Sequence, residues 1–155
     1  MIWEELKESI IITGLDAASY EDVMHQIGGR LVQEGYAKES YVDALIAREK
    51  EFPTGLDVDG VGVSIPHTDV SHVNREGIAI GVLNQPVTFV QMGTDDETVE
   101  VRLIFMLAVV NPSEHIDQLQ RIITIIQDKD FLNRLLEVKN AKQIIKIIKE
   151  KEKSL

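Results

Sequence analysis

The sequence predicts an α/β (mixed α+β) fold, a three-layer sandwich in which a mixed β-sheet carries helices on both faces. Three observations lead to this fold class. A block of apolar and β-branched runs occupies the middle of the 155-residue chain, and segments with helical periodicity lie before and after it. Within the block, residues 103–110 are apolar throughout. A strand without polar alternation is typical of one that is covered on both faces.

The first third of the chain predicts one short strand and two helices. The apolar run at residues 10–12 suits a strand. Val23, Ile27 and Leu31 recur every four residues and indicate a helix that ends near residue 35. A second helix is expected to begin at residue 39 or 40. It should end before Pro53, because a residue that precedes proline avoids the helical region.

The middle of the chain predicts four strands. We expect them at residues 61–65, 78–83, 87–90 and 99–110. Turn-forming residues separate these runs, among them Gly60, Pro66 and the segment 84–86. The expected sheet therefore forms from the centre of the sequence, with the helical segments available to cover it.

The last third of the chain predicts three helices. Ser113 is expected to cap the first of them. Its buried stripe should consist of Ile116, Leu119, Ile123 and Ile126. A short helix is expected around residues 131–136, and a final one at residues 141–149 that buries Ile144, Ile145 and Ile148. We expect a single domain at residues 1–149, followed by a solvated tail at residues 150–155.

Composition excludes several classes of function. The formal net charge is −10, from 16 basic and 26 acidic residues, which argues against a nucleic-acid binder. The absence of cysteine excludes disulfides, thiolate chemistry and cysteine-ligated metals. No apolar run approaches the length of a membrane span and the first residues do not form a secretory signal, so the expected location is the cytoplasm. Any phosphate must be held by local groups, because the overall field repels it.

One histidine stands in a distinctive setting, the pentapeptide Ile65-Pro66-His67-Thr68-Asp69. Pro66 stiffens the approach to His67, which should lie near the end of a strand, where α/β proteins place their sites. With an unperturbed pKa of about 6.5, a neutral imidazole is an available nucleophile near pH 7. From these residues alone, His67 can be a metal ligand, a general base or a phosphate carrier.

Neighbouring residues favour an anion site over a metal site. Arg48 should end a helix, and its planar fork suits a phosphoryl group. His115 should lie in the first turn of a helix, where free N–H groups and the dipole favour an anion. Thr54 and Thr68 offer hydroxyl groups.

Two further observations bear on metal binding. A metal site would have to use His67, Asp69 and His72, but the familiar helical zinc pattern is absent. His25 is expected on a helix surface.

These motifs together resemble one protein family. Arg48-Glu49, the segment Phe52-Pro53-Thr54-Gly55-Leu56, the segment Gly62-Val63-Ser64-Ile65-Pro66-His67 and the later Glu114-His115-Ile116 occur in that order. The set resembles the enzyme IIA domains of the phosphoenolpyruvate-dependent sugar phosphotransferase system, in the fructose/mannitol superfamily. Phe52 to Leu56 and the pair Thr68-Asp69 depart from the fructose and mannitol patterns and look like the galactitol-type branch.

The resemblance implies a phosphoryl relay. The carrier protein HPr would phosphorylate Nε2 of His67, with Arg48 and His115 contacting the phosphoryl group and Thr54, Thr68 and Asp69 in support. A cognate IIB protein would accept the group next, and a sugar alcohol such as galactitol would receive it through a membrane IIC protein. The family chemistry implies neither metal nor organic cofactor, and no direct membrane insertion. The alternative is a nitrogen-type regulatory module, whose phosphohistidine signals and does not feed transport.

Docking two partners in turn also predicts a partly apolar rim around the histidine. The sequence offers Ile65, Val70, Val73 and Met92 as candidates for that rim.

Overall fold

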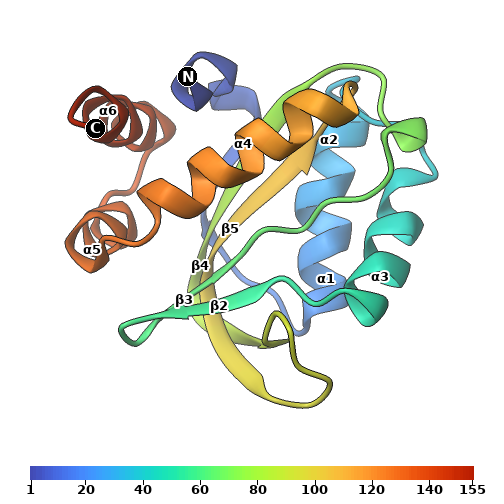
Figure 1. Ribbon diagram of the computed structural model, residues 1–155, viewed down its shortest axis with the longest axis horizontal. Helices are drawn as coiled ribbons and strands as arrows, with labels where there is room; N and C mark the ends of the chain where they lie inside the picture. The colour runs from blue at the N-terminus through green and yellow to red at the C-terminus, as the bar shows by residue number, and fades with distance from the viewer.

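A computed structural model describes the backbone of residues 1–155 and every side chain except that of Glu114. Five strands form one sheet in the spatial order β1-β4-β5-β3-β2 (Figure 1). The strands are β1 Ile11–Leu15, β2 Gly55–Val58, β3 Val61–Ser64, β4 Gly77–Val90 and β5 Thr98–Ala108. β1 pairs with β4 and β3 with β5 in parallel, whereas β4–β5 and β2–β3 are antiparallel. The predicted mixed sheet is confirmed.

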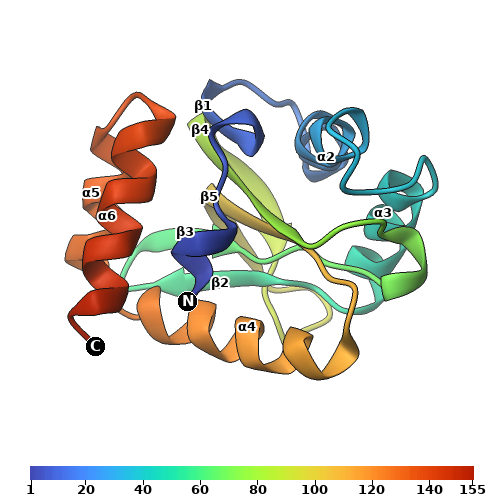
Figure 2. The same cartoon turned by 90° about the horizontal axis from the view of Figure 1, so that it is seen from above.

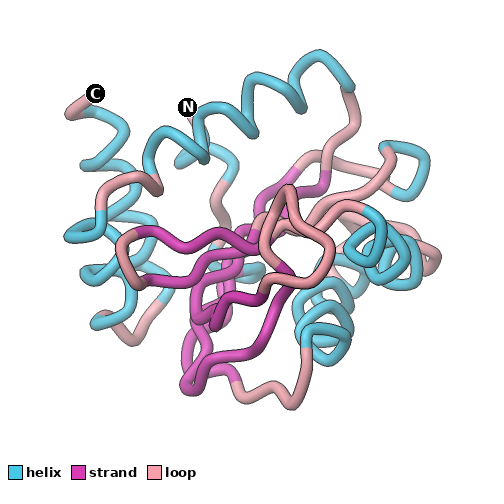
Figure 3. Tube along the Cα trace, turned by 60° about the horizontal axis from the view of Figure 1, so that its bottom comes forward, coloured by secondary structure: helices cyan, strands magenta, loops and turns pink.

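Helices cover both faces of this sheet. On one face lie α1 Tyr20–Val23, the π-helical segment η3 Met24–Gly28, α2 Gly29–Gln33 and α3 Tyr41–Glu51. On the other face lie α4 Pro112–Ile125, α5 Lys129–Glu137 and α6 Ala141–Lys153 (Figure 2). Short 3₁₀ helices are η1 Ile2–Glu5, η2 Glu8–Ile10 and η4 Val70–His72. Figure 3 shows the strands as a continuous layer between the helices, which confirms the three-layer prediction.

The central strand β5 separates two apolar cores. Leu103, Phe105 and Leu107 belong to the core beneath α4, α5 and α6. Ile104 and Met106, which alternate with them, belong to the core beneath α1 to α3. All five side chains are buried because the strand is covered on both faces, as its uninterrupted apolar sequence predicted.

Two features of the sheet differ from the sequence prediction. The segment 84–86 does not end a strand, because β4 runs through it with a register shift between Val82 and Val87. Pro86 is tolerated at such an irregularity because no ladder hydrogen bond is needed there. The strand β2 was not predicted. It forms a hairpin with β3 through Asp59 and Gly60, which both have positive φ as a tight hairpin turn requires.

The start of α4 also differs from the prediction. Its N-cap is Asn111, whose side chain accepts from the Ser113 N–H at 3.0 Å, so Ser113 is not the cap. Ile116 is 60% exposed and does not belong to the buried stripe, whose fully buried members include Ile122 and Ile125. The first turn of α4 borders a surface pocket instead of the sheet, which explains the exposure of Ile116.

The chain end was predicted as a solvated tail, and the structure corrects this for residues 150–153. The helix α6 continues to Lys153, and Glu152 is only 2% exposed. Its carboxylate accepts from the N–H groups of Ile2 at 3.0 Å and Trp3 at 2.7 Å, and lies 3.7 Å from Arg121. A contact between the two ends of the chain therefore holds this turn of helix.

Candidate functional site

The loop after β3 holds His67 in place through backbone hydrogen bonds. The carbonyl of Pro66 accepts from Leu107 N–H at 3.0 Å, which ties the loop to the central strand β5. The carbonyl of Leu107 in turn accepts from the buried hydroxyl of Tyr41 at 2.6 Å. Helix α3 and strand β5 thus both fix the loop. Nothing in the sequence pointed to Tyr41.

The imidazole of His67 has a defined tautomer. Its Nδ1 lies 2.8 Å from the carbonyl oxygen of Ile65. A carbonyl can only accept, so Nδ1 carries the proton and Nε2 keeps its lone pair. Burial lowers the pKa of His67, and His115 and Arg48 lower it further, whereas the bond to Ile65 acts in the opposite direction. The ring is therefore neutral near pH 7, with Nε2 as its nucleophilic atom.

A surface pocket of about 220 Å³ brings the three principal predicted residues together. Its lining consists of Arg48, His67, Thr68, Asp69, Val70, Pro112 and His115. The rings of His67 and His115 meet edge to face, with centroids 4.8 Å apart. Arg48 comes from the last turn of α3, and its guanidinium lies 4.3 Å from the centroid of the Phe52 ring. Burial and the charge of Arg48 both lower the pKa of His115.

The first turn of α4 offers fewer free donors than the sequence suggested. Pro112, the first helical residue, has no N–H group. The N–H of Ser113 is already bonded to Asn111. The helix dipole still favours an anion beside Pro112 and His115, but the side chains must supply most of the contacts.

The three supporting residues have different places. Thr54 is buried and does not line the pocket, and its hydroxyl donates to Glu49 at 2.8 Å. The expectation that it offers its hydroxyl to the site is therefore wrong. Thr68 is buried and lines the pocket. Asp69 also lines the pocket, and its side chain accepts from Ser71 N–H at 3.3 Å, which caps η4.

The metal alternative finds no support in the geometry. Nδ1 of His72 is 2.8 Å from the hydroxyl of Ser40, and His72 does not line the pocket. Among the residues that the structure describes, no group of three or more His, Cys, Asp or Glu side chains is arranged to hold a metal ion. His25 is exposed on its helix, as expected. In the same described part of the chain, no helix combines the length and apolarity needed to cross a membrane.

The predicted apolar rim is found only in part. Val70 lines the pocket and is partly exposed, whereas Ile65 and Val73 are buried and Met92, also partly buried, is not in the lining. Three more exposed apolar side chains lie close to pocket residues. Phe52 contacts the Arg48 guanidinium, while Ile116 follows His115 and Val110 precedes Pro112 by two positions in the sequence. The spacing of Ile116 fits the buried stripe of its helix and no sequence pattern distinguishes Phe52 as exposed, so the sequence does not predict this part of the rim.

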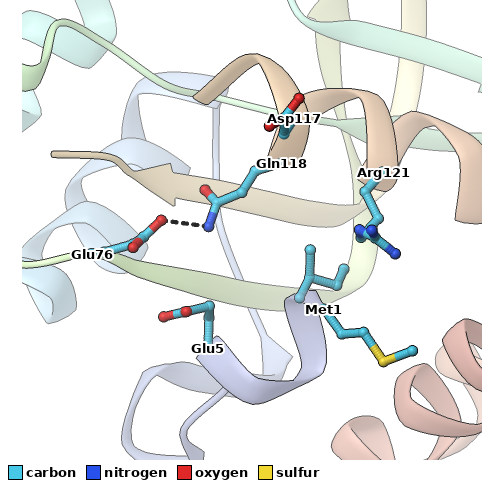
Figure 4. A pocket seen from close by; sticks show the side chains of 7 residues that line it. Met1, Glu5, Glu76, Asp117, Gln118 and Arg121 are labelled. Carbon is cyan, nitrogen blue, oxygen red and sulfur yellow. Dashed lines mark hydrogen bonds between the residues drawn. The ribbon is translucent and has the colours of Figure 1, made fainter. Parts of the chain in front are cut away.

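A second pocket, of about 280 Å³, lies between η1 and α4 (Figure 4). Glu5, Glu76 and Asp117 line it together with Gln118 and Arg121. The amide of Gln118 donates to Glu76 at 2.6 Å. Among the described residues, this lining carries three carboxyl groups against the guanidinium of Arg121 and the N-terminal amino group of Met1, so the pocket suits an anion less well than the one around His67.

Comparison with known sequences places the chain in a family. Residues 4–151 match the family described as phosphoenolpyruvate-dependent sugar phosphotransferase system, EIIA 2. The galactitol-specific EIIA component of Escherichia coli strain K12 is 30% identical over 124 residues, covering 80% of this chain and 82% of that protein. The mannitol-specific EIICBA component of Pasteurella multocida is 29% identical over 147 residues, covering 93% of this chain but 22% of that protein.

Solved structures share the fold. The nitrogen regulatory protein IIA-Ntr from Neisseria meningitidis is 29% identical and covers 95% of this chain and 98% of its own, with a TM-score of 0.79. Enzyme IIA mannitol of Escherichia coli, in its complex with phosphorylated enzyme IIB mannitol, is 25% identical with a TM-score of 0.78, covering 94% of this chain and 97% of its own.

The relatives lie in the fructose/mannitol superfamily and include galactitol-specific components, as the motifs predicted. The family match spans both the His67 loop and the helix that carries His115. The chain therefore belongs to the EIIA 2 family of the phosphoenolpyruvate-dependent sugar phosphotransferase system.

Proposed function

We propose that this chain is a cytoplasmic phosphocarrier that accepts a phosphoryl group from phosphorylated HPr on Nε2 of His67. The observation that carries the proposal is the 2.8 Å bond from Nδ1 to the carbonyl of Ile65, which leaves Nε2 as the nucleophilic ring atom. Its lone pair attacks phosphorus as the nitrogen–phosphorus bond of the donor breaks, and the electron pair of that bond returns to the donor imidazole. No metal or organic cofactor enters this transfer.

Arg48 and His115 stabilise the charge that passes between the two proteins. The guanidinium of Arg48 offers a planar set of donors to the equatorial oxygens of the phosphoryl group. His115, whose ring contacts that of His67, offers a further ring nitrogen beside the same pocket. Thr68 and Asp69 also line the pocket. The exposed apolar side chains Phe52, Val110 and Ile116 form the rim on which a partner docks.

The onward acceptor is a cognate IIB protein, and the final acceptor is a sugar alcohol such as galactitol, taken up through a IIC protein. The galactitol-specific relative in Escherichia coli supports this sugar class. The solved complex of enzyme IIA mannitol with phosphorylated enzyme IIB mannitol supports the kind of partner. The mannitol-specific EIICBA relative supports the link to a IIC component, because one chain there carries all three parts.

A reconstituted relay tests the proposal. The chain is incubated with phosphoenolpyruvate, enzyme I and HPr, and acid-labile phosphate is measured on the wild type and on His67→Ala. We expect about one phosphoryl group per wild-type chain and none on the variant. Phosphate that persists on His67→Ala would refute the assignment. Transfer from the wild type to a galactitol-type IIB protein then tests the onward step.

A regulatory role is the second candidate. It is favoured by the similarity to IIA-Ntr from Neisseria meningitidis, which covers 95% of this chain. A regulatory module would accept phosphate on His67 but would fail to pass it to the IIB protein. The second half of the relay experiment therefore separates the two functions.

A further inference from the structure

A buried carboxylate follows the pocket residue Arg48 in the sequence, lies outside the lining of the pocket around His67, and borders a separate pocket of about 210 Å³. Glu49 is 6% exposed at the end of α3, directly after Arg48. Its Oε2 accepts from the N–H of Thr54 at 2.8 Å, and its Oε1 accepts from the hydroxyl of Thr54 at 2.8 Å. Burial raises the pKa of Glu49, while the two bonds from Thr54 lower it. Burying a carboxylate costs free energy unless the group is hydrogen-bonded. Both oxygens of Glu49 are satisfied by the single residue Thr54, which makes this a specific contact.

Thr54 continues the contact toward the reactive histidine. Its carbonyl accepts from Ile65 N–H at 3.4 Å, and the carbonyl of Ile65 accepts from Nδ1 of His67 at 2.8 Å. The 3.4 Å bond is long, but it extends the β2–β3 ladder, whose first pair is Gly55 with Ser64. The adjoining β2–β3 ladder keeps Thr54 and Ile65 opposite each other, even though the hydrogen bond between them is weak. The side chain of Glu49 is thus linked to the ring of His67 by consecutive hydrogen bonds.

The same contact also constrains Arg48. Successive residues of an α-helix project about 100° apart. Glu49 points into the protein and Arg48 is exposed and lines the pocket. Fixing the inward side chain therefore fixes the rotation of the last helical turn and the direction in which the guanidinium leaves it. One buried contact sets the geometry of two groups in the pocket.

We propose that Glu49 is a positioning residue for phosphoryl transfer, which acts through Thr54 and Ile65 to hold the His67 ring in its Nδ1–H tautomer and to orient Arg48. This inference rests on the proposed function. Glu49 does not line the pocket, so it acts by geometry and not by direct contact with the phosphoryl group.

Variants of Glu49 separate geometry from charge. Glu49→Gln keeps both contacts, because its carbonyl oxygen accepts from the Thr54 N–H and its amide donates to the Thr54 hydroxyl, which can rotate to accept. Glu49→Ala loses both. Glu51→Ala removes an exposed carboxylate two residues further along the chain and is the matched control.

The tautomer of His67 is read from the ¹⁵N shifts of its two ring nitrogens in the unphosphorylated protein. We expect the Nδ1–H form in the wild type, Glu49→Gln and Glu51→Ala, and a shift toward the Nε2–H form in Glu49→Ala. We also expect Glu49→Ala to accept phosphate roughly 10-fold to 100-fold more slowly, because small misplacements of reacting groups have effects of this size. Glu49→Gln should restore most of the rate.

Thr54→Val is the second test if Glu49→Ala does not fold. It is nearly isosteric and removes only the hydroxyl bond to Glu49. We therefore expect a smaller shift toward the Nε2–H tautomer of His67 and a smaller loss of the phosphate-acceptance rate. Thr54→Ser, which keeps the hydroxyl, is its matched control. A folded Glu49→Ala with wild-type tautomer and rate would overturn the inference, as would a Glu49→Gln variant as impaired as Glu49→Ala. The ¹⁵N measurement needs no phosphate, so it judges the positioning role even if the wild type accepts no phosphoryl group and the proposed function fails.

Discussion

Acid should destabilise the wild-type protein more than the variant His67→Gln, because the folded chain keeps His67 neutral. Burial, with His115 and Arg48, holds the pKa of His67 below its usual value, despite the opposing bond to Ile65. In the unfolded chain the same group has a pKa of about 6.5. The unfolded chain therefore binds more protons in the window between the two values, and the free energy of unfolding rises with pH there.

The size and limits of this effect follow from the proton count. His67 contributes its full stability above about pH 6.5, and this contribution is lost as the pH falls through the lower pKa of the folded protein. One histidine can contribute a slope of at most about 1.4 kcal/mol per pH unit. His67→Gln removes the titrating group and keeps an amide that can donate to the Ile65 carbonyl. The difference in slope between the two proteins is therefore the expected signature.

Urea unfolding at a series of pH values between roughly 8 and 5 measures this difference. The ring protonation of His67, followed by NMR in the same range, should show a midpoint below 6.5. His115→Ala should move that midpoint upward, because it removes a neighbouring group that can carry positive charge and exposes the ring. Parallel stability curves for wild type and His67→Gln, or a midpoint at or above 6.5, would refute the reasoning.

Three further substitutions test other contacts. Arg48→Gln should slow acceptance of phosphate about 10²-fold in the HPr assay, with Arg48→Lys in between, because only arginine offers a planar fork. Glu152→Ala should lower the free energy of unfolding by roughly 2–4 kcal/mol in urea, since it strands the buried N–H of Ile2 and the partly buried N–H of Trp3, and the fluorescence of Trp3 should change. Ser64→Ala should leave stability unchanged or raise it by about 1 kcal/mol in thermal unfolding, because the buried Ser64 hydroxyl has no hydrogen-bond partner among the described residues.

The sequence predicted the features whose cause is local. The apolar run at residues 103–110 identified the central strand, and its residues 103–108 are all buried within β5, whereas Val110 lies beyond the strand and is exposed. The pentapeptide around His67 identified the candidate nucleophile because proline and the preceding strand fix a short loop. These predictions needed no knowledge of which segments meet in space.

Contacts between distant segments could not be predicted in this way. Glu152 bonds to Ile2 across 150 positions, so the chain end looked like a charged, solvated tail. Thr54 looked like a ligand for phosphate because the sequence does not show that its hydroxyl turns to Glu49. Ile116 fitted the helix stripe by spacing, but the first turn of α4 faces the pocket. In each case the sequence pattern predicted the local conformation, whereas the surroundings of the side chain in the folded protein determined what it does.

A carrier must hold its phosphoryl group weakly enough to release it to the next protein. Among the side chains that the structure describes, Arg48 is the only lysine or arginine that lines the pocket, and the exposed carboxylate of Asp69 lies in the same lining. The chain also carries a net charge of −10, which disfavours a bound anion. Strong local cations would stabilise the phosphohistidine as well as the transition state and would slow its discharge. Under the proposed function the site relies more on geometry than on charge, and in that case the buried contact of Glu49 with Thr54 contributes more to transfer than a second cation would.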